Sequence, residues 1–339
     1  MNIYDPTITE WQSILQSMPK FRAEQVYSGL YKGKHITEIT TIPKTLQAEL
    51  CEKFDTSLPR VDIKLTSKID GTVKYLFRMA DNTGIESVIM PYKHGRTICI
   101  STQAGCRMGC AFCASTVDGL ERNLTAGEMA GQILSAEKDL GERINHVVLM
   151  GSGEPLDNIE NVLAFIENAT HPKGLGISAR HITLSTCGLL DGIRRLEELH
   201  LQINLAISLH APNDTIRKTL MPIAKAVSVS ALRDAAKSYF EKTHRRVTFE
   251  YALIQGVNDS REAAEELAAL LHGCGGFHVN LIPVNKIQER TFQKSERSVE
   301  DMFVRILGKA GIAATVRRKM GADINAACGQ LRKANKAER

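Results

Sequence analysis

The sequence has few aromatic residues and no long apolar run, and both absences limit what the protein can be. Aromatic residues make up 5% of the 339 residues, and tryptophan occurs once. No segment reaches the roughly 18 consecutive apolar residues expected of a membrane-spanning helix. The N-terminal segment 1–9 also lacks the basic and apolar regions of a secretory signal. We therefore expect a cytoplasmic protein that has no membrane partner.

Neither positively nor negatively charged residues are in large excess. Lys and Arg together number 43 against 38 Asp and Glu, which gives a net charge of +5. Such a charge permits a nucleic-acid partner without requiring one. The length and the 43% hydrophobic content suit one large α/β domain with a smaller accessory domain.

Cysteine is present but unevenly distributed, with Cys106, Cys110 and Cys113 falling close together. Their C-x3-C-x2-C spacing has no fourth cysteine or histidine nearby, so it serves a four-coordinate structural zinc ion poorly. Thiolates are the usual ligands of iron–sulfur clusters, and three of them leave one iron of a [4Fe–4S] cube open to a substrate. The alternative is incidental cysteines or a redox pair. Three other cysteines are predicted to be small buried hydrophobic residues: Cys51, Cys187 and Cys274.

Hydrophobic periodicity divides the chain into a helical start and a strand-rich remainder. Apolar residues at three- and four-residue steps predict helices over 9–18, 22–31 and 44–54. Alternation then predicts a hairpin over 61–77 and two more strands over 84–91 and 96–102. Basic residues in the helical part could contact RNA phosphates or form a solvated face, and both readings stay open: Lys20, Arg22, Lys32, Lys34 and His35.

Strands and helices alternate after residue 102, which predicts a parallel sheet. The six units that begin with the strand ending at Thr102 predict an open (βα)6 barrel. Expected strands are 146–151, 181–186, 203–209, 247–253, 278–284 and 313–318. Expected helices are 125–140, 158–169, 191–200, 230–242 and 260–271, the first with a capping box from Thr125 and Glu128. The segment 331–339 has four basic residues and no apolar pattern, so we expect it to be disordered.

Polar residues stand where several of these strands end, and parallel strands place their chemistry at that edge. Gly153 and Glu154 follow the 146–151 strand. The glycine lets the backbone approach a ligand, and the carboxylate can accept hydrogen bonds from an ammonium group. The alternative is that this segment is a plain turn. Further strand ends carry Ser185, Ser208 with Leu209 and His210, and Asn285. Such groups can ring one small molecule.

These motifs resemble a known family. The C-x3-C-x2-C spacing with an aromatic residue before the last cysteine resembles the radical S-adenosylmethionine (SAM) superfamily, and the chain from Glu86 to Gln330 resembles its RlmN-type RNA methyltransferases, which act on adenine C2. The matching segments are 85–88, 99–106, 153–156, 208–213, 257–259, 278–283 and 323–331. Asn325 departs from the Asp usual in the family. Pro155 stands where the C8-methylating relatives have Ala, which favours C2.

The resemblance implies a radical-SAM barrel and a set of residue roles. Cys106, Cys110 and Cys113 would hold a [4Fe–4S] cluster. Gly153, Glu154, Ser185, Ser208, Leu209, His210 and Asn285 would bind SAM, with two SAM molecules used per turnover. Cys328 would be the methyl-accepting cysteine, Glu86 the proton acceptor, and Cys99 the resolving thiol that forms a transient disulfide with Cys328. The carboxylate of Glu86 lies in an apolar run, where it is costly unless paired or used.

The implied parts of the chain are four. They are a helical RNA-docking domain over 1–58, a β-hairpin extension over 59–95, the core barrel over 96–300, and a C-terminal helix, strand and tail over 301–339. Because Cys99 must reach Cys328, the tail is expected to fold over the site.

The implied substrate is adenosine 2503 of 23S ribosomal RNA, with adenosine 37 of some tRNAs as a further target. Flavodoxin or ferredoxin would reduce the cluster, and the chain would act as a monomer. Two alternatives stay open, a C8 methyltransferase and a non-catalytic iron–sulfur RNA-binding protein. The second would need neither Cys99 nor Cys328 nor Glu86.

Overall fold

One ten-stranded sheet runs through the described part of the molecule. The computed structural model describes residues 1–285, 291–326 and 329–331. The strand order is β1-β2-β3-β4-β7-β8-β9-β10-β11-β12. Neighbours from β4 onward are parallel, and β1 to β4 are antiparallel. The predicted α/β class with a partial barrel is therefore confirmed, because the first six parallel strands are those of the expected units.

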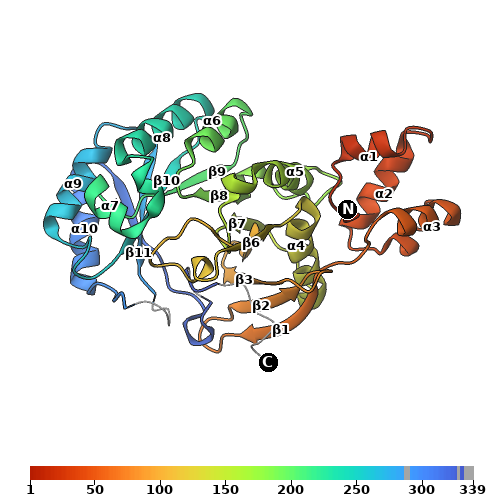
Figure 1. Ribbon diagram of the computed structural model, residues 1–339, viewed down its shortest axis with the longest axis horizontal. Coiled ribbons are helices and arrows are strands. Elements are labelled where there is room, and N and C mark those ends of the chain that lie inside the picture. Colours follow the sequence, from red (N-terminus) through yellow and green to blue (C-terminus); the bar gives the residue numbers. More distant parts are fainter. Residues whose placement is uncertain (286–290, 327–328, 332–339) are drawn as a thin grey trace.

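The parallel strands lie inside and the helices cover them outside (Figure 1). The strands are β4 (Gly95–Cys99), β7 (His146–Leu149), β8 (Ile182–Thr186), β9 (Asn204–Ser208), β10 (Val247–Leu253), β11 (Phe277–Pro283) and β12 (Ala313–Val316). The helices are α4 (Ala126–Leu140), α5 (Ile159–Thr170), α6 (Leu190–Glu198), α7 (Asp214–Leu220), α8 (Val229–Thr243), α9 (Arg261–Leu271) and α10 (Arg297–Lys309). Each predicted helix and strand of the barrel is present within a few residues of its predicted ends.

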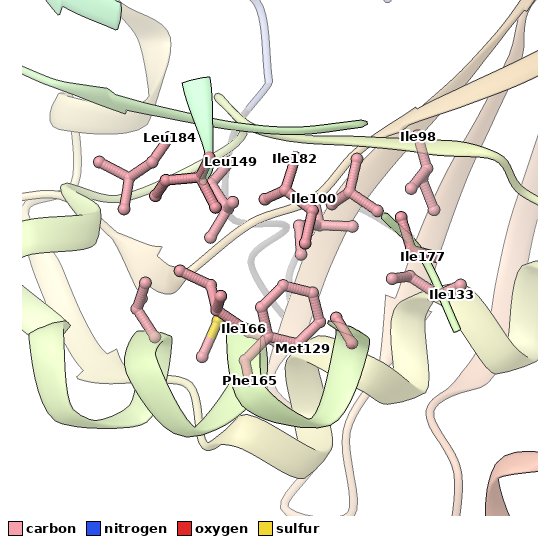
Figure 2. Packing of buried hydrophobic residues seen from close by; sticks show 14 of the residues in the cluster. Ile98, Ile100, Met129, Ile133, Leu149, Phe165, Ile166, Ile177, Ile182 and Leu184 are labelled. Atoms are coloured by element: carbon pink, nitrogen blue, oxygen red, sulfur yellow. The ribbon is translucent and has the colours of Figure 1, made fainter. Parts of the chain in front are cut away.

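The core of the barrel is a layer of aliphatic side chains between sheet and helices. Figure 2 shows Ile100 and Leu149 of the sheet above Met129 of α4 and Phe165 of α5. All four are at most 1% exposed. The predicted capping box begins α4, where the Thr125 side chain accepts from the Glu128 amide and the Glu128 carboxylate accepts from the Thr125 amide.

The N-terminal helices dock on the outer side of the barrel, beside α4 and α5 (Figure 1). They are α1 (Ile8–Ile14), α2 (Phe21–Tyr31) and α3 (Lys44–Lys53), close to the predicted ranges. The Gly127 amide at the start of α4 donates to Asp5 Oδ1 at 2.8 Å, and Tyr27 donates to Asn168 of α5 at 3.0 Å. Their apolar residues belong to the same hydrophobic cluster as those of the barrel.

The hairpin extension continues the barrel sheet past β4. It consists of β1 (Arg60–Thr66), β2 (Val73–Arg78) and β3 (Gly84–Tyr92), as the alternating pattern predicts. Residue Cys99 of β4 is paired with Val88 of β3. The extension therefore brings β3 directly beside the first barrel strand.

Three features differ from the sequence predictions. Two cysteines predicted to be buried are not, since Cys51 is exposed and Cys274 is only partly buried. Cys51 is exposed because α3 buries Leu46 and Leu50 and the next residue turns about 100° away from that face. The short paired strands β5 (Gln103–Gly105) and β6 (Leu120–Asn123), and the helix α7, were not expected.

The chain after β12 returns across the barrel to the hairpin extension. The Gly321 amide donates to Asp70 at 2.9 Å and the Lys68 amide donates to Asp323 at 3.0 Å. This is the expected course of the tail over the site. The disorder expected of 331–339 is wrong for Leu331, which is 4% exposed and packs in one apolar cluster with Cys99. The other residues of that segment, 332–339, lie outside the described ones. Across the described ranges, no helix is long and apolar enough to cross a membrane.

Candidate active site

A cavity opens at the carboxyl ends of the barrel strands, where the polar residues were expected. Its empty space, with the open mouth included, is about 1030 Å³. We call it the SAM cavity, after the ligand that the sequence predicts for these residues. Most of the predicted cluster and SAM residues line it: Cys106, Cys110, Cys113, Gly153, Glu154, Ser185, Ser208, His210 and Asn285. Leu209 packs in the apolar core instead, and its amide donates to the Glu250 carbonyl.

The loop that carries the three cysteines is held from both sides. It leaves β5 at Gly105, whose φ of +77° favours glycine, and returns through β6. The Ala111 amide donates to the Leu220 carbonyl at 2.8 Å, and the Ala114 amide donates to the Gly329 carbonyl at 2.8 Å. The barrel and the tail therefore both fix this loop at the cavity wall.

The thiols of this loop are poorly placed to ionise alone. Burial, with a smaller contribution from Cys113, raises the pKa of Cys106 to about 12. Burial likewise raises the pKa of Cys110, again with a contribution from Cys113. A cationic metal cluster removes this penalty, because coordinating thiols are deprotonated outright. The three thiols that line this cavity wall fit an iron–sulfur cluster.

Glu154 is the buried carboxylate of the cavity, 4% exposed. Its Oε1 accepts from the Leu156 amide at 3.0 Å, and its Oε2 accepts from the Cys187 amide at 2.7 Å. Burial raises the pKa of Glu154 and the hydrogen bonds oppose that shift. The bonds fix the carboxylate at the cavity wall, where an ammonium group would compensate its charge.

His210 faces the same cavity as a neutral ring. Its Nδ1 accepts from the Ala252 amide at 2.9 Å, and its ring meets Phe112 edge-on with centroids 4.7 Å apart. Burial lowers the pKa of His210 to about 3, with a smaller contribution from Arg217. A neutral imidazole with Nδ1 as acceptor carries its proton on Nε2. That N–H is a donor for a bound molecule.

A second cavity adjoins the first and contains Cys99. The two share lining residues, among them Met150, Asn285, Arg317 and Leu331. Cys99 packs there in one apolar cluster with Ala326 and Leu331. The methyl-accepting position predicted at Cys328 lies outside the described residues, between these two neighbours in sequence.

Glu86 stands on β3 near the second cavity. Because side chains alternate along a strand, Glu86 shares a face with Val88 and Met90, which line that cavity. Glu86 is 9% exposed, and its Oε1 pairs with Lys74 Nζ at 2.6 Å. The same Nζ donates to the Asn325 carbonyl at 3.2 Å. Lys74 therefore ties the carboxylate to the tail.

The sequence predictions missed three residues that line the SAM cavity, namely Cys187, Glu250 and Arg317. Glu250 is 5% exposed, and its Oε2 accepts from Asn280 at 2.8 Å and lies 3.9 Å from Arg317. A carboxylate inside the apolar strand 247–253 was a visible signal, the same one that singled out Glu86. Cys187 gave no such signal, since it was predicted to be a buried hydrophobic residue.

Comparison with known proteins identifies the superfamily of the chain. Residues 100–268 match the model of the radical SAM superfamily. A solved radical SAM methyltransferase from Sphaerobacter thermophilus is similar over 98% of this chain and 99% of its own, with a TM-score of 0.92 and 41% identity. The fold and the site thus define a radical SAM protein.

Curated relatives narrow the assignment. A probable dual-specificity RNA methyltransferase RlmN of Clostridium tetani is 55% identical over 93% of this chain and 90% of its own. The corresponding protein of Clostridium botulinum is 52% identical over 98% and 96%. This chain belongs to the RlmN family of radical SAM proteins. Membership implies a [4Fe–4S] cluster and SAM.

Proposed function

We propose that this protein methylates C2 of adenosine 2503 in 23S ribosomal RNA, and of adenosine 37 in some tRNAs, through a methylated Cys328. The relatives are named as dual-specificity RNA methyltransferases, which supports both RNA classes. The observation that carries the proposal is the apolar cluster in which Cys99 packs with Ala326 and Leu331, residues that bracket Cys328 closely in sequence.

Two thiols are needed because the methyl group passes through the protein. Carbon 2 of adenine is electron-poor and does not attack a methyl sulfonium, whereas a cysteine thiolate does. Cys328 takes the methyl group and its one-carbon unit then becomes bonded to C2. Cys99, as a thiolate, attacks the sulfur of Cys328 and forms a disulfide. The electron pair of the broken sulfur–carbon bond stays with the carbon, which takes up a proton and becomes the methyl group. Close packing of the tail against Cys99 supports this pairing.

Glu86 is the proposed acceptor of the C2 proton. It shares the face of β3 that leads to the second cavity, and its carboxylate is held by Lys74 at 2.6 Å. A base must lie within reach of its proton before its pKa matters. The position of Glu86 beside the second cavity, which Cys99 lines, supports this role.

The cluster and SAM residues keep their proposed roles. Cys106, Cys110 and Cys113 would hold the cluster and leave one iron open. When bound, the cluster and two SAM molecules per turnover supply the methyl group and the one-electron chemistry. Glu154 would bind the SAM ammonium group, and Gly153, Ser185, Ser208, His210 and Asn285 would contact the rest. Leu209 would support these residues from the core.

The remaining parts of the proposal concern partners and domains. The helical segment 1–58 would dock RNA. The hairpin extension over 59–95 would carry Glu86 to the barrel over 96–300, and the tail over 301–339 would carry Cys328 to it. The protein would act as a monomer, and flavodoxin or ferredoxin would reduce its cluster.

The position of the methyl group on adenine tests the function directly. Ribosomal RNA and tRNA from cells lacking the gene, and from cells regaining it, would be digested and analysed by mass spectrometry. We expect 2-methyladenosine to disappear and return in both RNA classes. An 8-methyl product would establish the C8 alternative, and unchanged RNA would leave the non-catalytic alternative.

A further inference from the structure

Arg217 is a cation that is buried completely inside the protein. Its side chain extends from α7 and is 0% exposed. Four backbone carbonyls accept hydrogen bonds from its guanidinium at 2.7–3.2 Å: Cys187, Ser208, Leu209 and Val227. Within the described ranges, no carboxylate forms an ion pair with it. A buried charge without an opposite charge is costly, so a guanidinium in this position calls for a compensating negative charge.

The carboxylate nearest in sequence has another partner. Asp214 begins the same helix, and its Oδ1 accepts from the Val229 amide at 2.7 Å. Burial lowers the pKa of Arg217, and opposing contributions come from Cys187 and Cys110 before Asp214. A guanidinium nevertheless stays protonated in proteins. The positive charge is therefore permanent, and thiols are its nearest acidic neighbours.

The helix that carries Arg217 packs against the loop of the three cluster cysteines. The carbonyl of its last residue, Leu220, accepts from the Ala111 amide at 2.8 Å. Leu220 and Cys187 belong to one apolar cluster, against which Cys110 packs. Cys187 lines the SAM cavity, whereas Arg217 does not. The guanidinium therefore lies behind the cavity wall, beside apolar residues that also contact a proposed cluster ligand.

We propose that Arg217 is the buried counter-ion of the iron–sulfur cluster, and that its charge makes one-electron reduction of the cluster easier. This inference rests on the cluster ligands proposed above. Three thiolates give a [4Fe–4S] cluster a net negative charge, and an added electron increases that charge. A cation held nearby in a medium of low dielectric constant stabilises the reduced state more than the oxidised state. The electron comes from the reductant, which is oxidised, and Arg217 keeps its protons throughout.

The hydrogen bonds of Arg217 also give it a structural role. Cys187 follows β8 and Ser208 ends β9, so the guanidinium holds the ends of two neighbouring barrel strands together. Loss of these bonds would loosen the strand ends whether or not a charge is present. The two roles can be separated by variants that remove the bonds and the charge independently.

The test is the reduction potential of the cluster in protein variants at Arg217. Wild type and Arg217→Gln would be loaded with iron and sulfide under anaerobic conditions and titrated with dithionite, and electron paramagnetic resonance would report the reduced cluster. Gln removes the charge and keeps an amide donor. The equilibrium constant for reduction should fall about tenfold or more, which is a shift of about 59 mV or more to lower potential. Arg217→Met, also neutral, takes the place of Arg217→Gln if the latter does not fold. An unchanged potential in a folded neutral variant would overturn the inference.

Arg217→Lys separates the charge from the hydrogen bonds. It keeps a cation at a pH of about 6 but loses the planar fork of the guanidinium. Its equilibrium constant for reduction should therefore lie within about twofold of the wild-type value. Raising the pH to about 10 removes the proton from a buried lysine but not from arginine, and the potential should then fall toward that of the neutral variants. A potential that runs parallel to that of wild type across this range would contradict the inference.

The matched control is Arg107→Gln. Arg107 precedes the same loop's Met108 and follows Cys106 in sequence, but its side chain is 62% exposed and pairs with Asp157. Solvent and salt screen such a charge, so the equilibrium constant for reduction should change by less than about twofold at about 0.5 M KCl. A shift as large as that of Arg217→Gln would refute the special role of the buried cation.

Cys110→Ala tests the ligand assignment on which the inference rests. If this variant keeps its [4Fe–4S] cluster, the ligands in the proposed function are wrong, and the inference fails with them. If it loses the cluster while Arg217→Gln keeps the wild-type potential, the proposed function stands and the inference alone is wrong.

Discussion

Glu154 is the residue whose surroundings define a ligand most closely. Its carboxylate is buried and fixed by two backbone amides, so a cation beside it gains a charged hydrogen bond in a dry site. Loss of such a bond costs about 1.5–3 kcal/mol, or about ten- to a hundredfold in affinity. Glu154→Gln should weaken SAM binding by that factor and keep the iron content, as measured by equilibrium dialysis and iron analysis.

Glu160→Gln is the matched control, because that carboxylate is exposed on α5 and pairs with Arg195. Its SAM affinity should equal that of wild type. Unchanged SAM affinity in Glu154→Gln would place the ammonium group elsewhere.

His210 gives the protein a predictable response to acid. Its pKa is lowered from 6.5 to about 3 by burial, so between these values the unfolded state binds a proton that the folded state does not. Stability is therefore lost as the pH falls below about 6.5, at about 1.4 kcal/mol per pH unit. Between pH 6.5 and 5, wild type should lose about 2 kcal/mol more than His210→Gln in denaturant titrations. Equal losses of stability in wild type and His210→Gln would contradict a buried neutral His210 ring.

Single residues also show what the sequence can and cannot predict about a site. Cys106, Glu154 and Asn285 were predictable because motif spacing and strand ends bring such residues together. Cys187 was not, because a cysteine after a strand looks the same in a core and in a cavity. Whether Cys187 lies in the core or lines the cavity depends on how the chain packs after β8, which its own sequence context does not show.

Among the elements, the paired strands β5 and β6 are those that hold the cluster loop. A Cβ atom at Gly105 would overlap the carbonyl oxygen of Gly119, which accepts from the Cys106 amide at 3.1 Å. Gly105→Ala should therefore displace the loop and lower the iron and sulfide content per protein.

The control for this change is Gly119→Ala. Gly119 has a similar positive φ of +66°, but no atom lies within 4 Å of its Cβ position. Both variants thus carry comparable backbone strain, and only the first carries the overlap. Equal iron content in the two variants would show that the overlap does not position the cluster ligands.

Helix α4 starts with the capping box that the sequence predicted. Thr125→Ala removes the side-chain acceptor for the Glu128 amide, which should cost about 1 kcal/mol in the free energy of unfolding. Thr125→Ser keeps the acceptor and should cost far less. Urea titrations of the three proteins measure this, and an equal loss in both variants would point to the methyl group instead of the cap.

Element prediction succeeded wherever a segment was long enough to show a period. The strand 247–253 and the helix 125–140 each repeat their pattern several times. The strand β5 has three residues, and α7 has only two apolar residues, Ile216 and Leu220, which are too few for a period to show. Their structure depends on contacts with the cluster loop and the barrel, which are distant in sequence.

At the scale of the whole molecule, the tail and the hairpin extension close the site together. Asp70 and Lys68 of the extension bind the tail at Gly321 and Asp323, and Lys74 binds it at Asn325. The return of the tail was predictable from the proposed meeting of Cys99 and Cys328. These particular contacts were not, because they join residues about 250 positions apart that carry no motif.

In the proposed mechanism, the methyl group reaches RNA through Cys328 and is released by Cys99. The most direct measurement is a denaturing gel of each variant isolated with cellular RNA, followed by nuclease treatment and peptide mass analysis. Cys99→Ala should stall with RNA joined to the protein through Cys328, whereas Cys328→Ala should accept no methyl group and form no adduct. Absence of the adduct in Cys99→Ala, together with RNA methylation by Cys328→Ala, would contradict the account.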